Sequence, residues 1–302
     1  MARRAAAKPR RPRLQDETAD RTLRRLLAAQ LAIVRTREPT ARRGSVEALH
    51  DVRVALRRMR SLTTTFAKLE PKFLADLDDR LSRTCDRMGD ARDLDVWIEL
   101  FRDLAASGGA AELSGRDQRR ILAAWRRRRT QLAAEALACG PFRRTKKMLR
   151  EFLRGRPPRR ADPPPAPAAC AARRILKMRE LVAKRYARVG NFSKGPAHDL
   201  RRAGRRLRYL SEFFAADLGR ECVRAGRWIT KAQAALGKVH DCDNALELSR
   251  ELPAGRAGTA VRRHLRKRRA AQLRKFKAAW RRYADRRLQK AWQTRLEAWA
   301  GK

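Results

Sequence analysis

The residues of this chain with the clearest chemical potential are histidine and arginine side chains at helical spacing. We call the first such set the first ridge, which consists of His50, Arg53, Arg57 and Arg60. On an α-helix, which advances about 100° per residue, these positions fall within about one quarter of the circumference. This face carries no carboxylate and spans about 15 Å of helix axis. Guanidinium groups bind phosphate oxygens through paired N–H donors, and a histidine can donate one further hydrogen bond. The spacing therefore predicts a phosphate-binding face.

The same arrangement returns 148 residues later. The second ridge consists of His198, Arg201, Arg205 and Arg208. An ungapped alignment of residues 50–66 with residues 198–214 gives nine identities in seventeen positions. The same offset aligns two Gly-x-x-x-Asp-x-Asp segments, residues 89–95 and 237–243, which we call the acidic motifs. Two separated blocks in one register indicate an internal duplication.

Each ridge lies on a segment that has an apolar stripe on its other side. In the first copy this stripe includes Val52, Leu56 and Met59, so the segment is predicted to be an amphipathic helix that buries the stripe within its own bundle. The ridges are then the strongest duplicated cationic surfaces. We expect them to meet across the interface between the copies and to form one site, with Arg58 and Arg206 at its flanks.

The ridges and the acidic motifs together resemble those of the CHAD family, the conserved histidine α-helical domain. The resemblance runs from about residue 14 to residue 300. It implies an all-α fold in which two pseudo-symmetric, four-helix-like bundles pack as one body. It also implies that a basic central surface binds inorganic polyphosphate. Family members are found joined or adjacent to polyphosphate and triphosphate enzymes, which makes polyphosphate-metabolising enzymes candidate partners, although no such catalytic domain is visible in this sequence.

The charge of the chain points to a polyanionic partner. Among 302 residues, 76 Lys and Arg stand against 32 Asp and Glu, a formal net charge of +44. Such a charge repels itself in the compact state, so we expect compensation by polyphosphate, nucleic acid or an anionic membrane. Five cysteines without a Cys-x-x-Cys pair indicate a reducing compartment. Without a long apolar run or a secretory stretch, we expect a cytoplasmic protein with no membrane span. The resemblance to the CHAD family adds the expectation that it is associated with polyphosphate granules.

Helical periodicity and the absence of a strand pattern predict an all-α chain. We interpret residues 1–13 as a disordered basic arm and residues 155–167 as a Pro-rich linker between helical repeats at 14–154 and 168–302. Helices are expected at 16–37, 46–69, 72–88, 93–106, 117–138, 141–153, 168–187, 196–217, 221–236 and 241–251, with one or two more over 258–300. The first should end before Pro39, Gly89 should close the third in the left-handed conformation, and Gly204 should mark the close approach of another backbone.

Three alternatives to polyphosphate binding differ in their support. No phosphate-binding Gly-rich loop, His-Glu-x-x-His sequence or nucleophile elbow occurs, so we expect neither catalytic residues nor a cofactor. A metal site built from His50, His198, His240 and the acidic motifs is weaker, because the flanking arginines would repel a divalent cation. We expect the motif aspartates to cap helices or to pair with arginines instead. Non-specific nucleic-acid binding is the serious rival, since basic helices bind phosphate backbones without a motif, although the few aromatic residues lie on apolar stripes.

Overall fold

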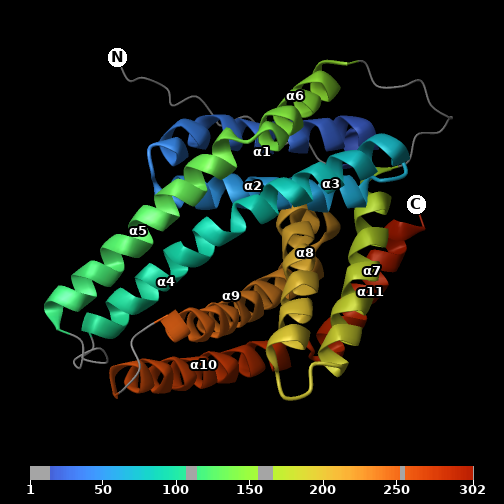
Figure 1. The fold of residues 1–302 in the computed structure, drawn as a ribbon. Helices are drawn as coiled ribbons and strands as arrows, with labels where there is room; N and C mark the ends of the chain where they lie inside the picture. The colour runs from blue at the N-terminus through green and yellow to red at the C-terminus, as the bar shows by residue number, and fades with distance from the viewer. Residues whose placement is uncertain (1–13, 107–113, 156–165, 252–255, 302) are drawn as a thin grey trace, which may run out of the picture.

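The computed structural model describes residues 14–106, 114–155, 166–251 and 256–301, and this part of the chain is helical without a strand. The prediction of an all-α fold is confirmed (Figure 1). The predicted basic arm and most of the predicted linker lie outside the described residues. The helices are α1 (Ala19–Arg42), α2 (Val46–Thr65), α3 (Pro71–Arg87), α4 (Gly89–Ala106), α5 (Gly115–Ala138), α6 (Gly140–Arg154), α7 (Pro167–Ala187), α8 (Lys194–Leu218), α9 (Arg220–Leu248), α10 (Arg256–Tyr283) and α11 (Arg286–Ala300), with 3₁₀ turns at Leu14–Asp16 and Ser249–Glu251.

The helix boundaries repeat along the chain. The first residues of α1 and α7 are 148 positions apart, and so are those of α2 and α8. Helix α9 spans the positions that α3 and α4 occupy in the first copy, and α10 and α11 then follow as α5 and α6 do. The offset found in the sequence is therefore also present in the succession of helices. The pseudo-two-fold relation between the two bundles stays a prediction.

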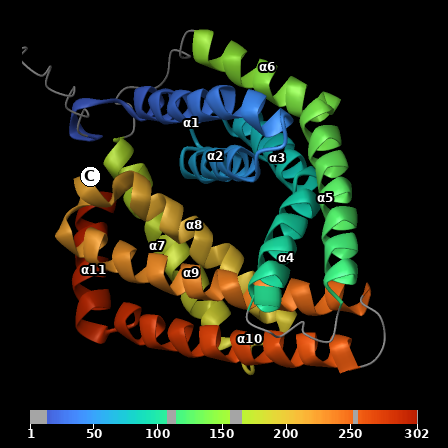
Figure 2. The ribbon, with the colours of Figure 1, turned by 90° about the vertical axis from the view of Figure 1, so that its left-hand side faces the viewer.

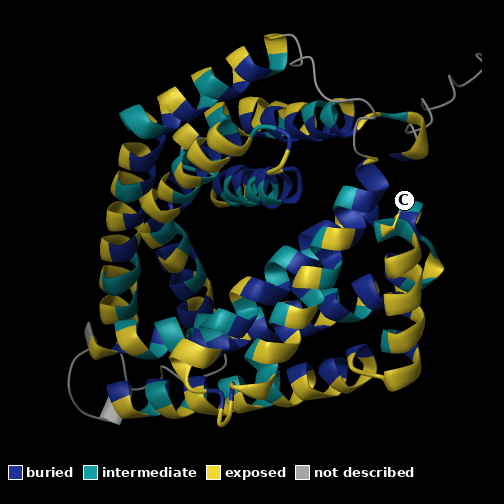
Figure 3. Cartoon of the chain, turned by 90° about the vertical axis from the view of Figure 1, so that its right-hand side faces the viewer, coloured by how far each residue is buried: buried dark blue, intermediate teal, exposed yellow. Residues whose placement is uncertain are grey.

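Two hydrophobic cores hold the helices together. The larger core joins α1, α2, α3 and α6 to α7, α8, α9 and α11, and it contains the apolar stripes of both motif helices. The smaller core joins the α4–α5 pair to the α9–α10 pair through Trp97, Phe101, Trp125, Val261 and Leu265. Figure 2 shows these two helix pairs meeting at one corner of the molecule. Buried and exposed residues alternate around most helices in Figure 3, as amphipathic helices require.

Two equivalent ion pairs tie the acidic motifs to neighbouring loops. We call them the first clamp, made of Asp95, Arg129 and the Gly44 carbonyl, and the second clamp, made of Asp243, Arg269 and the Phe192 carbonyl. In both clamps the arginine Nε donates to the aspartate at 2.6 Å, and the same guanidinium group also donates to the loop carbonyl. Both loop residues have positive φ, 97° at Gly44 and 60° at Phe192.

The clamps decide between the two roles expected of these aspartates. Asp95 and Asp243 lie inside α4 and α9, so the prediction that they cap helices is wrong, whereas the prediction that they pair with arginines is confirmed. The pair of Asp95 with Arg129 is almost fully buried, with side chains 1% and 4% exposed. A buried charge needs such a partner because desolvation alone would cost several kcal/mol, roughly, per ion.

Helix α1 continues through Pro39 to Arg42, so the prediction that it ends before this proline is wrong. Proline removes one backbone hydrogen bond, and here that loss falls in the last turn on an exposed face. The same turn is held from outside, because Glu38 accepts hydrogen bonds from Arg42 and from Lys146 of α6. Helix α2 ends at Thr65, earlier than expected, in a run of threonines whose hydroxyls donate to preceding carbonyl groups.

The glycines of the acidic motifs lie in helical backbone. Gly89 begins α4 and Gly237 lies within α9, and neither has positive φ. The left-handed conformation predicted for Gly89 is therefore wrong, and so is the division of residues 221–251 into two helices. Leu236 and Val239 are 1% and 0% exposed. Burying each contributes about 1.5–3 kcal/mol, which outweighs the cost of about 1 kcal/mol for a helix-interior glycine.

The space beside Gly204 is filled by a side chain. A Cβ at this position would lie 2.1 Å from Nε2 of Gln233 in α9. The neighbour is thus an amide side chain rather than the backbone predicted from the sequence. In the part of the chain that the structure describes, no helix combines the length and the apolar character needed to cross a membrane.

Candidate anion-binding site

The two motif helices contact each other, and the ridges meet where they do. Helix α8 reaches α2 from below in Figure 1, and both helices keep their apolar stripes in the larger core. At the contact lies a pocket, which we call the α2–α8 pocket. It is lined by Arg57, Arg60, Ser61, Arg202, Arg205, Arg206 and Tyr209. Five guanidinium groups from the two copies thus surround one small space.

Few carboxylates reach this pocket. Arg60 pairs with Asp78 of α3 at 3.2 Å, and Arg57 donates from Nε to the Tyr209 hydroxyl at 3.3 Å. Among the described residues, no hydrogen bond or ion pair engages the guanidinium group of Arg205. The same holds for the other two lining arginines of α8, Arg202 and Arg206. The pocket therefore keeps an excess of positive charge that an entering anion would offset.

The cost of that charge appears in the pKa values. Burial, and then repulsion from Arg57 and Arg201, lowers the pKa of Arg205 to about 9. Burial and repulsion from Arg60 also lower the pKa of Arg206. These guanidinium groups remain protonated at neutral pH, yet the fold destabilises their charge. A bound anion would relieve both causes, because it replaces lost solvation and screens the repulsion.

The N-terminal arginines of the ridges lie against the acidic motifs. Arg53 Nη1 donates to the Cys85 carbonyl at 2.6 Å. The same atom would lie 3.9 Å from a Cβ added to Gly89, so it packs beside this glycine. In the second copy, Arg201 Nε lies 3.9 Å from the equivalent place at Gly237. Burial, and then repulsion from Arg57, lowers the pKa of Arg53 to about 10. The two ridges thus contact the acidic motifs in equivalent ways.

Asp93 and Asp241 are the equivalent aspartates that face these arginines. Burial raises the pKa of both carboxyl groups, although Arg201 acts on each of them in the opposite direction. In their ionised form they offset part of the cationic charge at this end of the ridges. The positive charge of the site therefore increases from one end to the other. Carboxyl groups lie near Arg53 and Arg201, whereas the α2–α8 pocket contains guanidinium groups without an ion-pair partner among the described residues.

The histidines lie at the same end of the ridges. Burial, and then repulsion from Arg92 and Arg57, lowers the pKa of His50 to about 4. Burial and nearby arginines also lower the pKa of His198. The ring of His198 stacks on that of His240 with centroids 5.2 Å apart, and burial followed by repulsion from Arg201 lowers the pKa of His240 to about 3. All three imidazoles are uncharged at neutral pH, and each can still donate one hydrogen bond.

The remaining predicted residues lie outside the α2–α8 pocket. Arg58 and Arg208 both pair with Glu212, and both guanidinium groups lie over the Tyr209 ring. The buried Nε atom of Arg58 has no hydrogen-bond partner among the described residues, whereas that of Arg208 lies 3.4 Å from a Glu212 carboxylate oxygen. The two residues predicted as flanks therefore differ, because Arg206 lines the pocket whereas Arg58 is held by a carboxylate beside it.

Three lining residues were missed by the sequence analysis, namely Ser61, Arg202 and Tyr209. Ser61 and Tyr209 are equivalent under the 148-residue offset, and both stand eleven positions after the ridge histidine. On a helix this spacing returns to within about 20° of the starting direction, so a longer row would have included them. Arg202 gave no duplicated signal, because the first copy has Val54 at this position.

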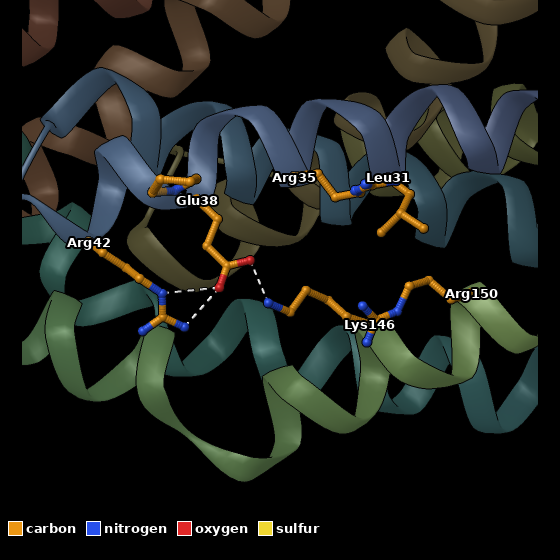
Figure 4. A pocket seen from close by; sticks show the side chains of 7 residues that line it. Leu31, Arg35, Glu38, Arg42, Lys146 and Arg150 are labelled. Carbon is orange, nitrogen blue, oxygen red and sulfur yellow. Dashed lines mark hydrogen bonds and ion pairs between the residues drawn. The ribbon is translucent and has the colours of Figure 1, made fainter.

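A second basic cleft lies between α1 and α6 and is shown in Figure 4. It is lined by Leu31, Arg35, Glu38, Pro39, Arg42, Lys146 and Arg150. Glu38 sits among the cations and pairs with Arg42 and Lys146. Burial raises the pKa of Glu38, but these two cations outweigh it and the net shift is downward. The charged residues of this cleft hold α1 and α6 together, and they are not repeated in the second copy.

The described residues contain no group of three His, Cys, Asp or Glu side chains placed to hold a metal ion. The acidic motifs divide their aspartates instead between the clamps and the ridge arginines.

Comparison with known proteins shows which family has this architecture. The CHAD domain model matches residues 25–250. The crystal structure of the CHAD domain from the plant Ricinus communis is similar, with a TM-score of 0.63 and 23% sequence identity over 94% of this chain and 93% of that chain. PptA from Streptomyces chartreusis has a TM-score of 0.63 and 19% identity over 92% of this chain and 100% of that chain. No curated protein matches the sequence. At these identities the solved structures show a shared fold, and the family model spans well over half of the sequence, so the chain belongs to the CHAD domain family.

Proposed function

We propose that this protein binds inorganic polyphosphate, without catalysis, through the two ridges and the α2–α8 pocket. The observation that carries the proposal is the meeting of five arginines from both copies around one pocket, where Asp78 is the single carboxylate of the described residues that pairs with a lining arginine. Guanidinium groups are suited to phosphate oxygens, and a chain of phosphates supplies charge along the length of the ridges. The binding surface extends over His50, Arg53, Arg57, Arg58, Arg60, His198, Arg201, Arg205, Arg206 and Arg208.

Polyphosphate explains the site better than nucleic acid does. The large aromatic rings are buried or half-buried and many pack on one another, as in the stack of Tyr186 on Trp280 and the cluster of Trp97 with Trp125. Binding of single-stranded nucleic acid normally uses exposed rings on which bases stack. Nucleic acid remains the second candidate because exposed arginines elsewhere on the surface can hold a phosphate backbone without sequence preference. The proposed setting is the cytoplasm, at polyphosphate granules and beside polyphosphate-metabolising enzymes.

The deciding experiment compares two quadruple variants of equal charge change. The site variant carries R53A, R57A, R201A and R205A, and the control variant carries R281A, R282A, R286A and R287A on the exposed faces of α10 and α11. Affinity for long-chain polyphosphate is measured at physiological salt. The site variant should lose at least about a hundredfold, since a hydrogen bond to a charged group contributes about 1.5–3 kcal/mol, and the control should lose about threefold or less.

Both variants are also titrated with RNA, and their helical content is checked by circular dichroism. Equal losses from the two variants would mean that net charge alone drives binding. An RNA affinity that matches the polyphosphate affinity would favour the nucleic-acid alternative.

A further inference from the structure

Tyr209 presents a buried hydroxyl group to the α2–α8 pocket. The residue is only 1% exposed, yet it is one of the residues that line the pocket. It lies on α8 one turn after Arg205, and its equivalent in the first copy is Ser61. The second copy therefore places a phenol where the first copy places a short hydroxyl side chain.

The hydrogen bonds of this phenol are incomplete. Its oxygen accepts from Arg57 Nε at 3.3 Å, but no group among the described residues accepts its proton. A phenol carries one O–H donor, and a buried donor without an acceptor costs about 1–3 kcal/mol. The lining supplies no such acceptor, because arginines have none and the Ser61 hydroxyl, which donates to the Arg57 carbonyl at 3.4 Å, makes no hydrogen bond with the phenol.

The electrostatic surroundings favour an anion as the missing acceptor. Burial raises the pKa of the Tyr209 phenol, but the cations of Arg57, Arg205 and Arg208 outweigh it and bring the pKa below its usual value. These cations polarise the O–H bond and strengthen the phenol as a donor. They would also bind an anion placed within reach of that donor, so one ligand oxygen would satisfy the phenol and the guanidinium groups together.

We infer that the Tyr209 hydroxyl donates a hydrogen bond to a phosphoryl oxygen of the ligand in the α2–α8 pocket. The inference rests on the proposed function and adds to it a neutral binding residue contributed by the second copy alone. Ser61 does not share the role, because its hydroxyl is engaged by the carbonyl of its own helix. The pocket is thus asymmetric although the ridges are duplicated.

The test is the Y209F variant, which removes the hydroxyl and keeps the ring in its packing. Its affinity for tripolyphosphate and for long-chain polyphosphate should fall about tenfold, which corresponds to about 1.4 kcal/mol. The matched control is Y186F, which removes a phenol packed against Trp280 away from the pocket and should bind like the wild type. The thermal unfolding midpoints of both variants are measured to verify the fold.

A second measurement separates a direct contact from an effect through Arg57. Y209F is repeated in an R57A background, where a direct hydrogen bond predicts that affinity still falls. A loss that disappears in this background would make Tyr209 a positioning residue for Arg57 and overturn the inference.

The phenol can also be followed spectroscopically, because the chain has three tyrosines. Ultraviolet difference titration should show one phenol whose pKa rises when tripolyphosphate is added, and this transition should be missing in Y209F. Wild-type affinity in Y209F would overturn the inference while the loss in the quadruple site variant upheld the proposed function. Absence of polyphosphate binding by the wild type would instead overturn the proposed function itself.

Discussion

The ridge histidines are uncharged at neutral pH. His50 has a pKa of about 4 in the fold, because it is buried and faces Arg92 and Arg57, whereas an exposed histidine titrates near 6.5. Between these values the unfolded chain binds more protons than the folded chain does. Stability must therefore fall as the pH drops from about 6.5 to about 4, and His240 extends the same trend downward. At neutral pH the imidazoles are uncharged donors in a field of guanidinium groups.

We predict that the H50Q variant loses less stability than the wild type between pH 6.5 and pH 4. Glutamine keeps a hydrogen-bond donor and takes up no proton, so one source of the acid-dependent loss disappears. The free energy of unfolding is measured in urea at several pH values, with H264Q on α10 as the matched control. An NMR titration in which the His50 ring protonates near pH 6.5 would contradict the prediction.

The two clamps connect helices to the loops that precede the motif helices α2 and α8. Each clamp joins an acidic-motif aspartate, an arginine of α5 or α10 and the carbonyl of the loop that precedes α2 or α8. The loop then fixes where the motif helix begins, and hence the direction in which its ridge points. The aspartates and the loop residues of the two clamps are both 148 positions apart, although the loop residue is Gly44 in one and Phe192 in the other, and the arginines are 140 positions apart.

We predict that R129A destabilises the protein by about 3–5 kcal/mol, because it leaves the charge of Asp95 buried without a partner. The matched control is R80A, which breaks the exposed pair with Asp76 and should cost about 1 kcal/mol or less. Chemical denaturation gives both values. If R129A costs no more than R80A, the first clamp does not hold the α1–α2 loop.

The whole molecule carries a net charge of +44, which no internal pairing can balance. Many ion pairs of the described residues are local and exposed, such as those of Arg80 with Asp76 and of Arg83 with Asp79 one turn away. Exposed charges of this kind add little stability and are screened by salt. A polyanion would therefore meet a long-range attraction over the entire surface and a specific arrangement of arginines at the ridges.

We predict that polyphosphate binds without a metal ion and that salt weakens binding steeply. Counterion release makes the logarithm of the affinity fall in proportion to the logarithm of the salt concentration. Long-chain polyphosphate is titrated at several salt concentrations, with and without a chelator of divalent cations. Removal of most of the affinity by the chelator would replace direct arginine binding with a metal-bridged mode.

The sequence by itself determined the helices, the duplication and the face on which each ridge lies. These properties depend on local periodicity, and a spacing of three and four residues places His50 and Arg57 on one side of a helix in any tertiary setting. The long-range consequence that the ridges meet was inferred from the apolar stripes, and the structure brings Arg57 and Arg205 to one pocket.

The tertiary structure alone decided how the side chains of the ridges are shared among partners. Arg58 and Arg206 occupy equivalent positions in the two copies. Arg58 forms an ion pair with Glu212, whereas Arg206 lines the α2–α8 pocket. Helix α9 stays continuous where the first copy breaks at Met88, although both copies have a glycine followed by buried apolar residues there, so the local sequence does not predict the difference. Sequence periodicity specifies the side of a helix on which a side chain lies. The residue that this side chain contacts depends on how a second helix packs against the first.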